Sequence, residues 1–162
     1  MATKRVKVRG IANWAKVFEP NRDFTGYKDA LKDSGGQTVI DLHMDEDNIN
    51  KLMATGSGKV PKPSQDYDGK QVVKFTRPWQ HPKFDWAGGA PEVVHADGTK
   101  WDIDDDGLIG NGSIVDVVAD VYPAGDKTGT RLRKVIVVEH VPYAPTVNDE
   151  LPETAMEDEI PF

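Results

Sequence analysis

The segment Ser-Ile-Val-Asp-Val-Val-Ala-Asp-Val-Tyr, residues 113–122, decides the fold class. Its apolar side chains are mostly Val and Ile, which favour strands. A second segment of the same character follows at residues 130–141, Thr-Arg-Leu-Arg-Lys-Val-Ile-Val-Val-Glu-His-Val. Pro123, Gly125 and Gly129 lie between the two and are typical of a hairpin loop. The pair predicts two long antiparallel strands.

Four more strands are predicted towards the N-terminus, at residues 4–17, 38–44, 71–75 and 92–95. The first is expected to bend, with a kink or bulge at Gly10. Helical crossover segments between the strands are missing, so a parallel sheet is disfavoured. The pattern predicts a mainly β protein, either a small barrel or a sandwich.

Two short helices and two long loops complete the expected secondary structure. Asp45 is placed to cap a helix whose apolar stripe is Ile49, Leu52 and Met53, and residues 27–32 form one or two helical turns. Residues 55–70 are rich in Gly, Ser, Pro and Lys, which predicts a long mobile loop. Residues 76–89 are predicted to be irregular.

The acidic charge of the chain is concentrated at its end. The 162 residues carry a net charge of −7, and six of the 27 acidic residues lie from Asp149 onwards, where Lys and Arg are absent. The remaining 21 acidic residues face 20 Lys and Arg, so the body is nearly neutral. We therefore expect one domain, residues 1–143, and a flexible acidic C-terminal tail, residues 144–162.

The absence of Cys excludes disulfides, a thiolate nucleophile and Cys-based zinc sites. The sequence has no apolar run long enough to span a membrane and no signal peptide, so a cytoplasmic protein that does not bind membranes is expected. No ordered catalytic triad or carboxylate pair stands out, so the chain is not expected to be an enzyme and no cofactor is implied.

The strongest internal signal is the segment at residues 74–86, in which four aromatic residues and three strong bases alternate. Rings that stack on bases and cations that follow phosphates are what a sequence-tolerant binder of single strands needs. The alternative is a loop that its own aromatic side chains pin to the barrel. The predicted nucleic-acid-binding residues are Trp14, Lys16, Arg22, Tyr27, Lys74, Arg77, Trp79, Lys83, Phe84, Trp86, Arg131 and Arg133.

Two further basic groups and one acidic run have less specific interpretations. Lys4, Arg5, Lys7 and Arg9 form a basic N-terminal arm that is more often a solvated strand face. The run Asp102-Ile103-Asp104-Asp105-Asp106-Gly107 matches the start of a calcium loop. Its twelfth position is Ser113 where a calcium loop has Glu, so an acidic surface turn is the favoured interpretation, and no metal site is predicted.

The last residues combine three carboxylates with an apolar end that could dock into a basic-rimmed pocket of another protein. The predicted partner-binding tail is Glu157, Asp158, Glu159, Ile160, Pro161 and Phe162. Six carboxylates imitate a short run of phosphates, and Phe162 imitates a base. We therefore expect the tail to lie over the nucleic-acid groove until bound DNA displaces it.

The ending Asp-Glu-Ile-Pro-Phe resembles the acidic tip of bacterial single-stranded DNA-binding proteins. The body instead resembles the single-stranded DNA-binding proteins of tailed phages, through residues 15–21 (Ala-Lys-Val-Phe-Glu-Pro-Asn), 93–98 (Val-Val-His-Ala-Asp-Gly) and 109–113 (Ile-Gly-Asn-Gly-Ser). The loops at residues 55–70 and 76–89 do not align with that family, so the contact residues above rest on local chemistry.

The resemblance implies a five-stranded oligonucleotide-binding barrel, the OB-fold, that binds single-stranded DNA without sequence preference. It also implies a role in phage DNA replication, recombination and repair, in which the tail recruits a polymerase, a helicase or primase, or a nuclease. A homodimer is left open. Two alternatives remain: a β-barrel adaptor that binds protein, and a calcium-binding β-domain that uses Asp102, Asp104 and Asp106.

Overall fold

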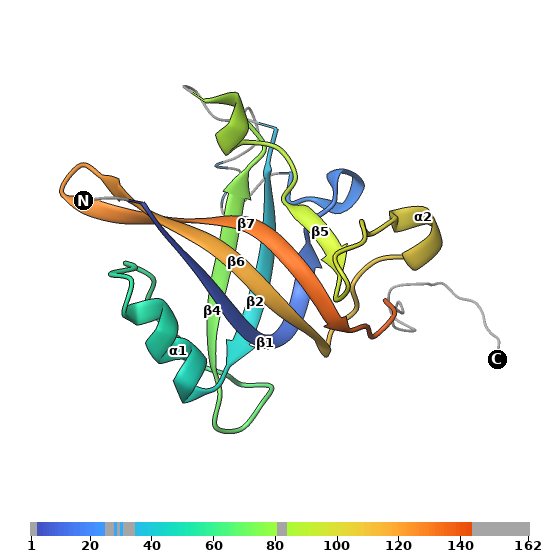
Figure 1. The fold of residues 1–162 in the computed structure, drawn as a ribbon, viewed down its shortest axis with the longest axis horizontal. Coiled ribbons are helices and arrows are strands. Elements are labelled where there is room, and N and C mark those ends of the chain that lie inside the picture. The colour runs from blue at the N-terminus through green and yellow to red at the C-terminus, as the bar shows by residue number, and fades with distance from the viewer. Residues whose placement is uncertain (1–2, 25–27, 29, 31–34, 81–83, 144–162) are drawn as a thin grey trace.

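The computed structural model describes residues 3–24, 28, 30, 35–80 and 84–143. It consists of a single curled sheet with short helices around it (Figure 1). The elements are β1 (Lys4–Lys16), η1 (Glu19–Asn21), β2 (Gln37–Met44), α1 (Glu46–Met53), β3 (Lys62–Pro63), β4 (Gln71–Pro78), η3 (Asp85–Ala87), β5 (Glu92–His95), α2 (Ile103–Asp106), β6 (Ser113–Ala124) and β7 (Lys127–Glu139). The prediction of a mainly β protein is confirmed, and so is the predicted helix after Asp45, which is α1. The helix α2 was not predicted and forms where the sequence indicated an acidic turn.

The strands follow the order β3-β4-β2-β1-β6-β7-β5. Neighbouring strands are antiparallel except β5 and β7, which run parallel. The short strands β3 and β5 are added at the two edges of a five-stranded arrangement, β4-β2-β1-β6-β7. The sheet therefore has the strands that an OB-fold requires, with one extra strand at each edge.

Strand β1 makes the sheet curl because its two halves pair with different partners. Lys4 to Ala12 pair with β6, and Ile11 to Lys16 pair with β2 (Figure 1). Gly10 lies at the change of partner, where a Cβ atom would come within 2.5 Å of the His43 carbonyl oxygen. The pairing with β6 is regular across Gly10, so the predicted bulge is not there. The irregularity lies between Asn13 and Lys16 in the β1–β2 ladder.

The curl brings β4 close to β7, but in the described part of the chain no backbone ladder joins them. The Arg77 side chain of β4 crosses the gap and donates a hydrogen bond of 3.3 Å from Nη1 to the Leu132 carbonyl oxygen of β7. The barrel is therefore left partly open, and a side chain connects β4 and β7 across the gap.

The core lies inside the curl. It is formed by one side of each long strand, with Val8, Ile40, Leu42, Phe75, Val115, Val117, Leu132 and Val135 at 0% exposure. Leu132 and Val135 both face inwards although two residues, Arg133 and Lys134, lie between them, a spacing that in a regular strand places side chains on opposite faces. The reason is a bulge in β7, where Val118 pairs with Lys134 and Ala119 with Leu132, so that Arg133 is the extra residue.

Several predicted boundaries were wrong. The β6–β7 loop has only two residues, Gly125 and Asp126, because Ala124 already pairs with Lys127. Gly129 lies inside β7, where any side chain would clash with the Tyr122 ring. Strand β4 extends to Pro78 and takes in the start of the predicted irregular segment. The predicted loop at residues 55–70 contains β3. Most of the predicted helical turns at residues 27–32 lie outside the described residues.

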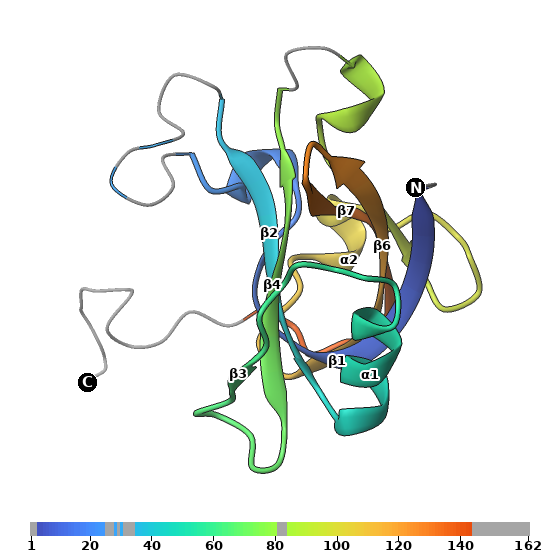
Figure 2. The ribbon, with the colours of Figure 1, turned by 90° about the vertical axis from the view of Figure 1, so that its left-hand side faces the viewer.

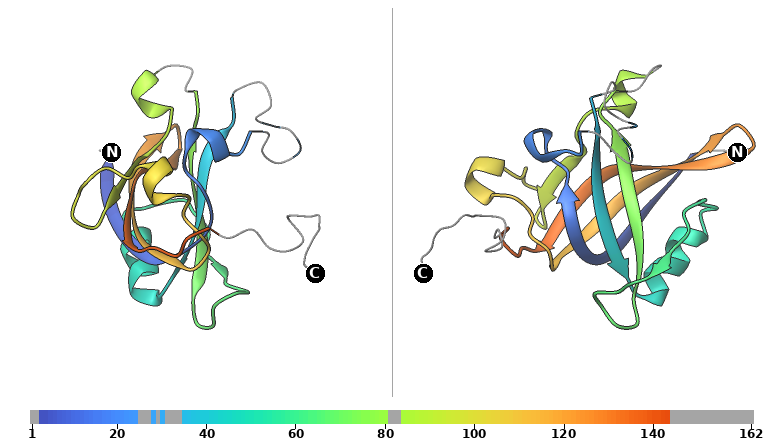
Figure 3. Two further views of the ribbon diagram at one scale, coloured as in Figure 1. Left: turned by 90° about the vertical axis from the view of Figure 1, so that its right-hand side faces the viewer. Right: turned by 180° about the vertical axis from the view of Figure 1, so that it is seen from behind.

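The helices occupy different sides of the barrel. α1 and η3 lie at opposite ends (Figures 1 and 2), while α2 and η1 lie beside β5 (Figure 3). The Asp45 carboxylate accepts a hydrogen bond of 3.0 Å from the Asn48 N–H, as predicted for the cap of α1. Ile49 and Leu52 of α1 are buried against the core. Within the described residues, no helix has the length and apolar character to cross a bilayer.

Candidate nucleic-acid interface

The end of the barrel near η3 is organised by the buried guanidinium of Arg77. Besides its bond to β7, it donates to the carbonyl oxygens of Trp86 and Gly88, the latter at 3.1 Å. These bonds fix the η3 segment over the gap between β4 and β7. Burial lowers the pKa of Arg77, and the positive charges of Arg131 and Arg133 lower it further. Three arginines therefore lie close enough at this end of the barrel for their positive charges to repel one another.

Arg131 connects η3 to the β6–β7 hairpin. Its guanidinium carbon lies 4.9 Å from the centre of the Trp86 ring and 4.5 Å from that of Tyr122. Trp86 also stacks with Phe84, at 5.4 Å between ring centres and an interplanar angle of 29°. Trp86 is 61% exposed and Phe84 48%. We call Phe84, Trp86, Arg131 and Tyr122 the η3 stack; it combines exposed aromatic surface with a cation that faces rings.

A second arrangement of the same kind is centred on Arg22. Its guanidinium carbon lies 4.4 Å from the Phe24 ring centre and 4.2 Å from that of Trp79. It also donates to the carbonyl oxygens of Glu19 and Gly35, at 2.8 and 2.7 Å. We call Arg22, Phe24 and Trp79 the Arg22 stack. The Gly89 N–H donates to the Trp79 carbonyl oxygen at 2.8 Å, which ties the two stacks together through the backbone.

The outer face of β1, β2 and β4 carries further cations. Lys16 pairs with Val39, and Asp41 pairs with Lys74, so these side chains share the face turned away from the core. The Lys74 ammonium lies 3.2 Å from the Asp41 carboxylate and remains exposed. Trp14 is also exposed and lies at the irregularity in β1. The strands corresponding to β2 and β4 are those with which OB-folds bind oligonucleotides.

Lys59 adds a cation that sequence reasoning missed. Its loop lies against β7, where the Ser57 and Thr130 hydroxyl oxygens are 2.6 Å apart and the Thr128 hydroxyl donates to the Gly56 carbonyl oxygen at 2.9 Å. Burial lowers the pKa of Lys59, and the charge of Lys74 lowers it further. A half-buried lysine beside another lysine is a favourable place for an anion.

The basic N-terminal arm has a different environment. Arg9 donates to both carboxylate oxygens of Asp116, at 2.7 and 3.1 Å, and Arg5 donates to Asp120 at 3.0 Å. The bond to Asp116 raises the pKa of Arg9. Arg133 also donates to Asp120, at 3.3 Å. These arginines neutralise carboxylates on the outer face of β1, β6 and β7, which matches the expected strand face.

The predicted contact residues therefore fall into four groups. Arg22, Arg77, Trp79, Phe84, Trp86 and Arg131 meet at the η3 end of the barrel. Trp14, Lys16 and Lys74 lie on the outer face of β1, β2 and β4, while Arg133 faces Asp120 instead. Tyr27, Lys83 and the tail residues 157–162 lie outside the described residues.

Tyr122 and Phe24 were missed together with Lys59. Tyr122 belongs to the segment that predicted β6, and its approach to Arg131 depends on the two-residue hairpin loop. Phe24 lies two positions after Arg22, a spacing that could have suggested a shared cluster.

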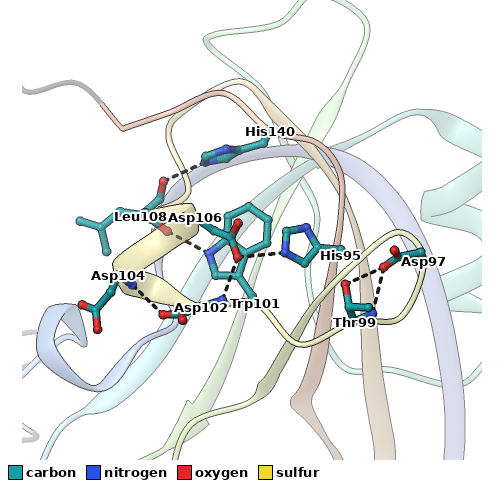
Figure 4. A network of polar contacts seen from close by, with 10 residues as sticks. His95, Asp97, Thr99, Trp101, Asp102, Asp104, Asp106, Leu108 and His140 are labelled. Carbon is teal, nitrogen blue, oxygen red and sulfur yellow. Dashed lines mark hydrogen bonds and ion pairs between the residues drawn. The ribbon is translucent and has the colours of Figure 1, made fainter.

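The acidic run forms the short helix α2 and uses its carboxylates internally (Figure 4). The Asp106 carboxylate lies 2.9 Å from His95 Nε2 and accepts a hydrogen bond of 2.9 Å from the Asp102 N–H. The bond from Asp102 and the contact with His95 lower the pKa of Asp106. Asp102 accepts from the Asp104 N–H at 2.9 Å. Within the described residues, no three His, Asp or Glu side chains gather as a metal-binding group.

The α2 network also fixes Trp101. Its indole N–H donates to the Gly107 carbonyl oxygen at 2.9 Å, and its ring lies between His95 and His140, with ring centres 4.6 and 4.8 Å away. His140 Nε2 lies 3.0 Å from the Leu108 carbonyl oxygen (Figure 4). The acidic run thus anchors the β5–β6 connection to the barrel, consistent with a structural turn.

Comparison by sequence finds no matching family model and no matching curated protein. Solved structures do match. The chain is similar to gp2.5, a single-stranded DNA-binding protein encoded by bacteriophage T7, with a TM-score of 0.60 and 19% identity over 95% of this chain and 100% of that one.

The single-stranded DNA-binding protein of bacteriophage Enc34 is also similar. Its complex with single-stranded DNA matches with a TM-score of 0.57 and 12% identity, over 86% of this chain and 89% of that one. A form with a C-terminal truncation matches with a TM-score of 0.56 and 14% identity, over 86% and 88% of the two chains. The resemblance predicted from short sequence segments is thus confirmed at the level of structure: this chain has the fold of phage single-stranded DNA-binding proteins.

Proposed function

We propose that the chain binds single-stranded DNA without sequence preference. The observation that carries the proposal is the η3 stack, in which the exposed rings of Phe84 and Trp86 lie beside the largely buried guanidinium of Arg131. Exposed rings are unfavourable in water, but they stack on any unpaired base. Support comes from the fold, which this chain shares with two phage proteins that bind single-stranded DNA.

We assign the contacts by what each side chain faces. Trp86 and Phe84 of the η3 stack and Trp79 of the Arg22 stack supply stacking surface, and Arg22, Arg131 and Lys16 supply positive charge for phosphates. Lys74 adds an exposed ammonium that it shares with Asp41. The two terminal nitrogens of Arg77 are directed at three carbonyl oxygens, so its role is to hold η3 in place. Lys59 extends the positive charge from Lys74 towards β7. Rings that stack on base faces and cations that contact phosphates do not depend on the base edges, which is why we infer tolerance of sequence.

The biological role and the partners belong to the same proposal. Two solved neighbours come from bacteriophages, so we infer that the chain coats and protects single strands during phage DNA replication, recombination and repair. We further propose that it does so without catalysis, and that Glu157 to Phe162 recruit replication proteins such as a polymerase, a helicase or primase, or a nuclease. The acidic tail would compete with DNA for the same cations.

The test is a titration of the full chain with oligo-dT while tryptophan fluorescence is recorded at several salt concentrations. We expect quenching, since Trp14 and Trp86 are exposed, and a slope of log K against log salt of about −2 to −4, because each phosphate contact on a single strand contributes about −0.7. A matched duplex should bind much more weakly, since its bases are not available for stacking. No quenching, or no dependence on salt, contradicts the proposal.

The same titration on a chain ending at Tyr143 tests the tail. Removal of the six carboxylates should tighten binding most at low salt, where electrostatic competition is least screened. Equal affinity for both chains at low salt would show that the tail does not compete with DNA.

A further inference from the structure

Trp14 has a backbone conformation that is unfavourable for its residue type. Its φ angle is +52°, in the left-handed region that bulky residues rarely occupy. It lies between Asn13 and Lys16, where the register of the β1–β2 ladder shifts. The side-chain oxygen of Asn111 accepts a hydrogen bond of 2.8 Å from the Trp14 N–H and holds the backbone in this conformation.

Folding alone does not explain a tryptophan at this position. The side chain is 62% exposed, while Ala15 and Val17 beside it supply the buried side chains. Glycine would adopt the same φ angle without strain and would leave the core unchanged. Strained residues of this kind cluster at functional sites, where the surrounding structure holds them. The exposed indole of Trp14 is therefore a candidate contact for a ligand.

A cavity of about 360 Å³ lies beside the indole, and its lining has the chemistry of a base-binding site. Trp14 and Tyr143 provide aromatic surface, Leu108 and Ile109 provide apolar surface, and Lys16 and Asn111 provide a cation and an amide. Tyr143 is brought here by the bridge between Ile109 and Pro142. Its ring is 52% exposed, so two exposed aromatic residues border one cavity.

We propose that this cavity is a separate subsite for one unpaired base of the bound strand, which stacks on Trp14 while Lys16 contacts the adjoining phosphate. The inference rests on the proposed function. Lys16 shares the outer face of β1, β2 and β4 with Lys74, so the strand's phosphates can continue from this subsite across the sheet. The η3 stack and this subsite then hold two different nucleotides.

The test separates a contact with the base from a contact with the backbone of the strand. Affinities of the wild-type chain, Trp14→Phe and Trp14→Gly are measured for oligo-dT and for an abasic oligomer of the same length and charge. On oligo-dT we expect Trp14→Gly to lose about 5- to 100-fold in affinity, because one stacked base is removed. Trp14→Phe should retain most of the affinity. On the abasic oligomer the three proteins should bind equally.

Thermal melting shows whether the Trp14→Gly variant remains folded. We expect its Tm to equal or exceed that of the wild-type chain, since glycine relieves the left-handed strain and the lost side chain is exposed. Val60→Ala, which removes another exposed apolar side chain that does not line the cavity, is the matched control and should bind like the wild type.

Each outcome bears on one statement only. Failure of the wild-type chain to bind oligo-dT overturns the proposed function. If the wild type binds and Trp14→Gly binds oligo-dT equally well, the proposed function stands and the subsite is refuted. An equal loss on oligo-dT and on the abasic oligomer also refutes the subsite, because Trp14 would then act without a base.

Discussion

Two arginine-rich regions of this protein look alike in sequence and differ in what their cations face. Arg5 and Arg9 on β1 lie against the buried carboxylates of Asp120 and Asp116. Arg131, at the η3 end of the barrel, lies between the rings of Trp86 and Tyr122. A carboxylate neutralises a guanidinium, whereas a ring stabilises it without cancelling its charge. Arg131 is 7% exposed and pairs with Asp120 across the β6–β7 ladder, but no hydrogen bond between the two side chains accompanies its ring contacts in the described residues. The difference shows that a basic cluster becomes a candidate phosphate site through its neighbours and not through its count of arginines.

Removal of one arginine from each region tests whether the neighbours of an arginine decide its contribution to DNA binding. We expect Arg131→Ala to lower the affinity for oligo-dT by about 10- to 100-fold, since it removes a cation and the support of the exposed Trp86 ring. Arg9→Ala should change the affinity less than about twofold, because the charge of Arg9 is already paired with Asp116. Both affinities are measured by fluorescence titration at one salt concentration.

Equal losses for the two variants would show that net charge alone governs binding, and the distinction between paired and stacked arginines would be wrong. Circular dichroism of both variants at the titration temperature serves as the control for folding. Arg131→Lys sharpens the result, since lysine keeps the charge and loses the flat guanidinium that lies between the rings.

Sequence reasoning predicted the elements whose signals are local. The long β6 and β7 strands, the bent β1 and the α1 helix capped by Asp45 all follow from patterns within about a dozen residues. The predicted aromatic and basic segment at residues 74–86 is divided by the structure: Lys74 lies on the outer face of β4 and Phe75 in the core, while Arg77, Trp79, Phe84 and Trp86 lie at the η3 end of the barrel. Residues 81–83 lie outside the described residues. The segment is held to the barrel, as the alternative interpretation required, but by Arg77 and not by its aromatic side chains; Trp86 stays exposed, and its contact with nucleic acid stays a prediction.

The features that sequence reasoning missed depend on register between distant segments. The bulge at Arg133 reverses which residues of β7 face the core, and no local pattern indicates it. Arg77 was predicted to contact phosphates because it belongs to a segment in which bases and aromatic residues are interspersed, yet its side chain is turned towards the Leu132 carbonyl oxygen, 55 positions away. The parallel pairing of β5 with β7 was also missed, because the turn residues between strands do not indicate which distant strands pair.

Replacement of Arg77 tests whether the η3 end depends on a buried guanidinium. Arg77→Gln should lower the free energy of unfolding by about 2–3 kcal/mol, because hydrogen bonds from a charged donor to several buried carbonyl oxygens are lost together. It should also weaken oligo-dT binding indirectly, since η3 presents Trp86. Urea denaturation gives the stability, and titration well below the unfolding midpoint gives the affinity.

Arg77→Lys is the matched variant for this prediction, because it keeps the charge but cannot reach three acceptors in a planar fork. We expect it to be nearly as destabilised as Arg77→Gln. A lysine variant of wild-type stability would mean that charge, and not the geometry of the guanidinium, holds the two edges of the barrel together.

The smallest expected effect concerns Lys59, a cation that faces neither a carboxylate nor a ring in the contacts described above. Burial and Lys74 lower its pKa below the ordinary value of 10.5, so its charged form is unfavourable in the free protein. Lys59→Gln should therefore raise Tm at pH 7, and the gain should vanish as the pH rises towards 10.5, where the folded wild type has lost this proton. If a phosphate contacts Lys59, the same variant should make the salt slope less steep by about 0.7.

The matched control Lys100→Gln removes an exposed lysine beside β5 and should change neither quantity. A variant that is more stable but binds DNA with the wild-type salt slope would exclude Lys59 from the interface, while a gain in both stability and affinity would show that the charge opposes binding. The predicted combination, higher stability with one phosphate contact fewer, would mean that the protein keeps an unfavourable charge because DNA compensates for it.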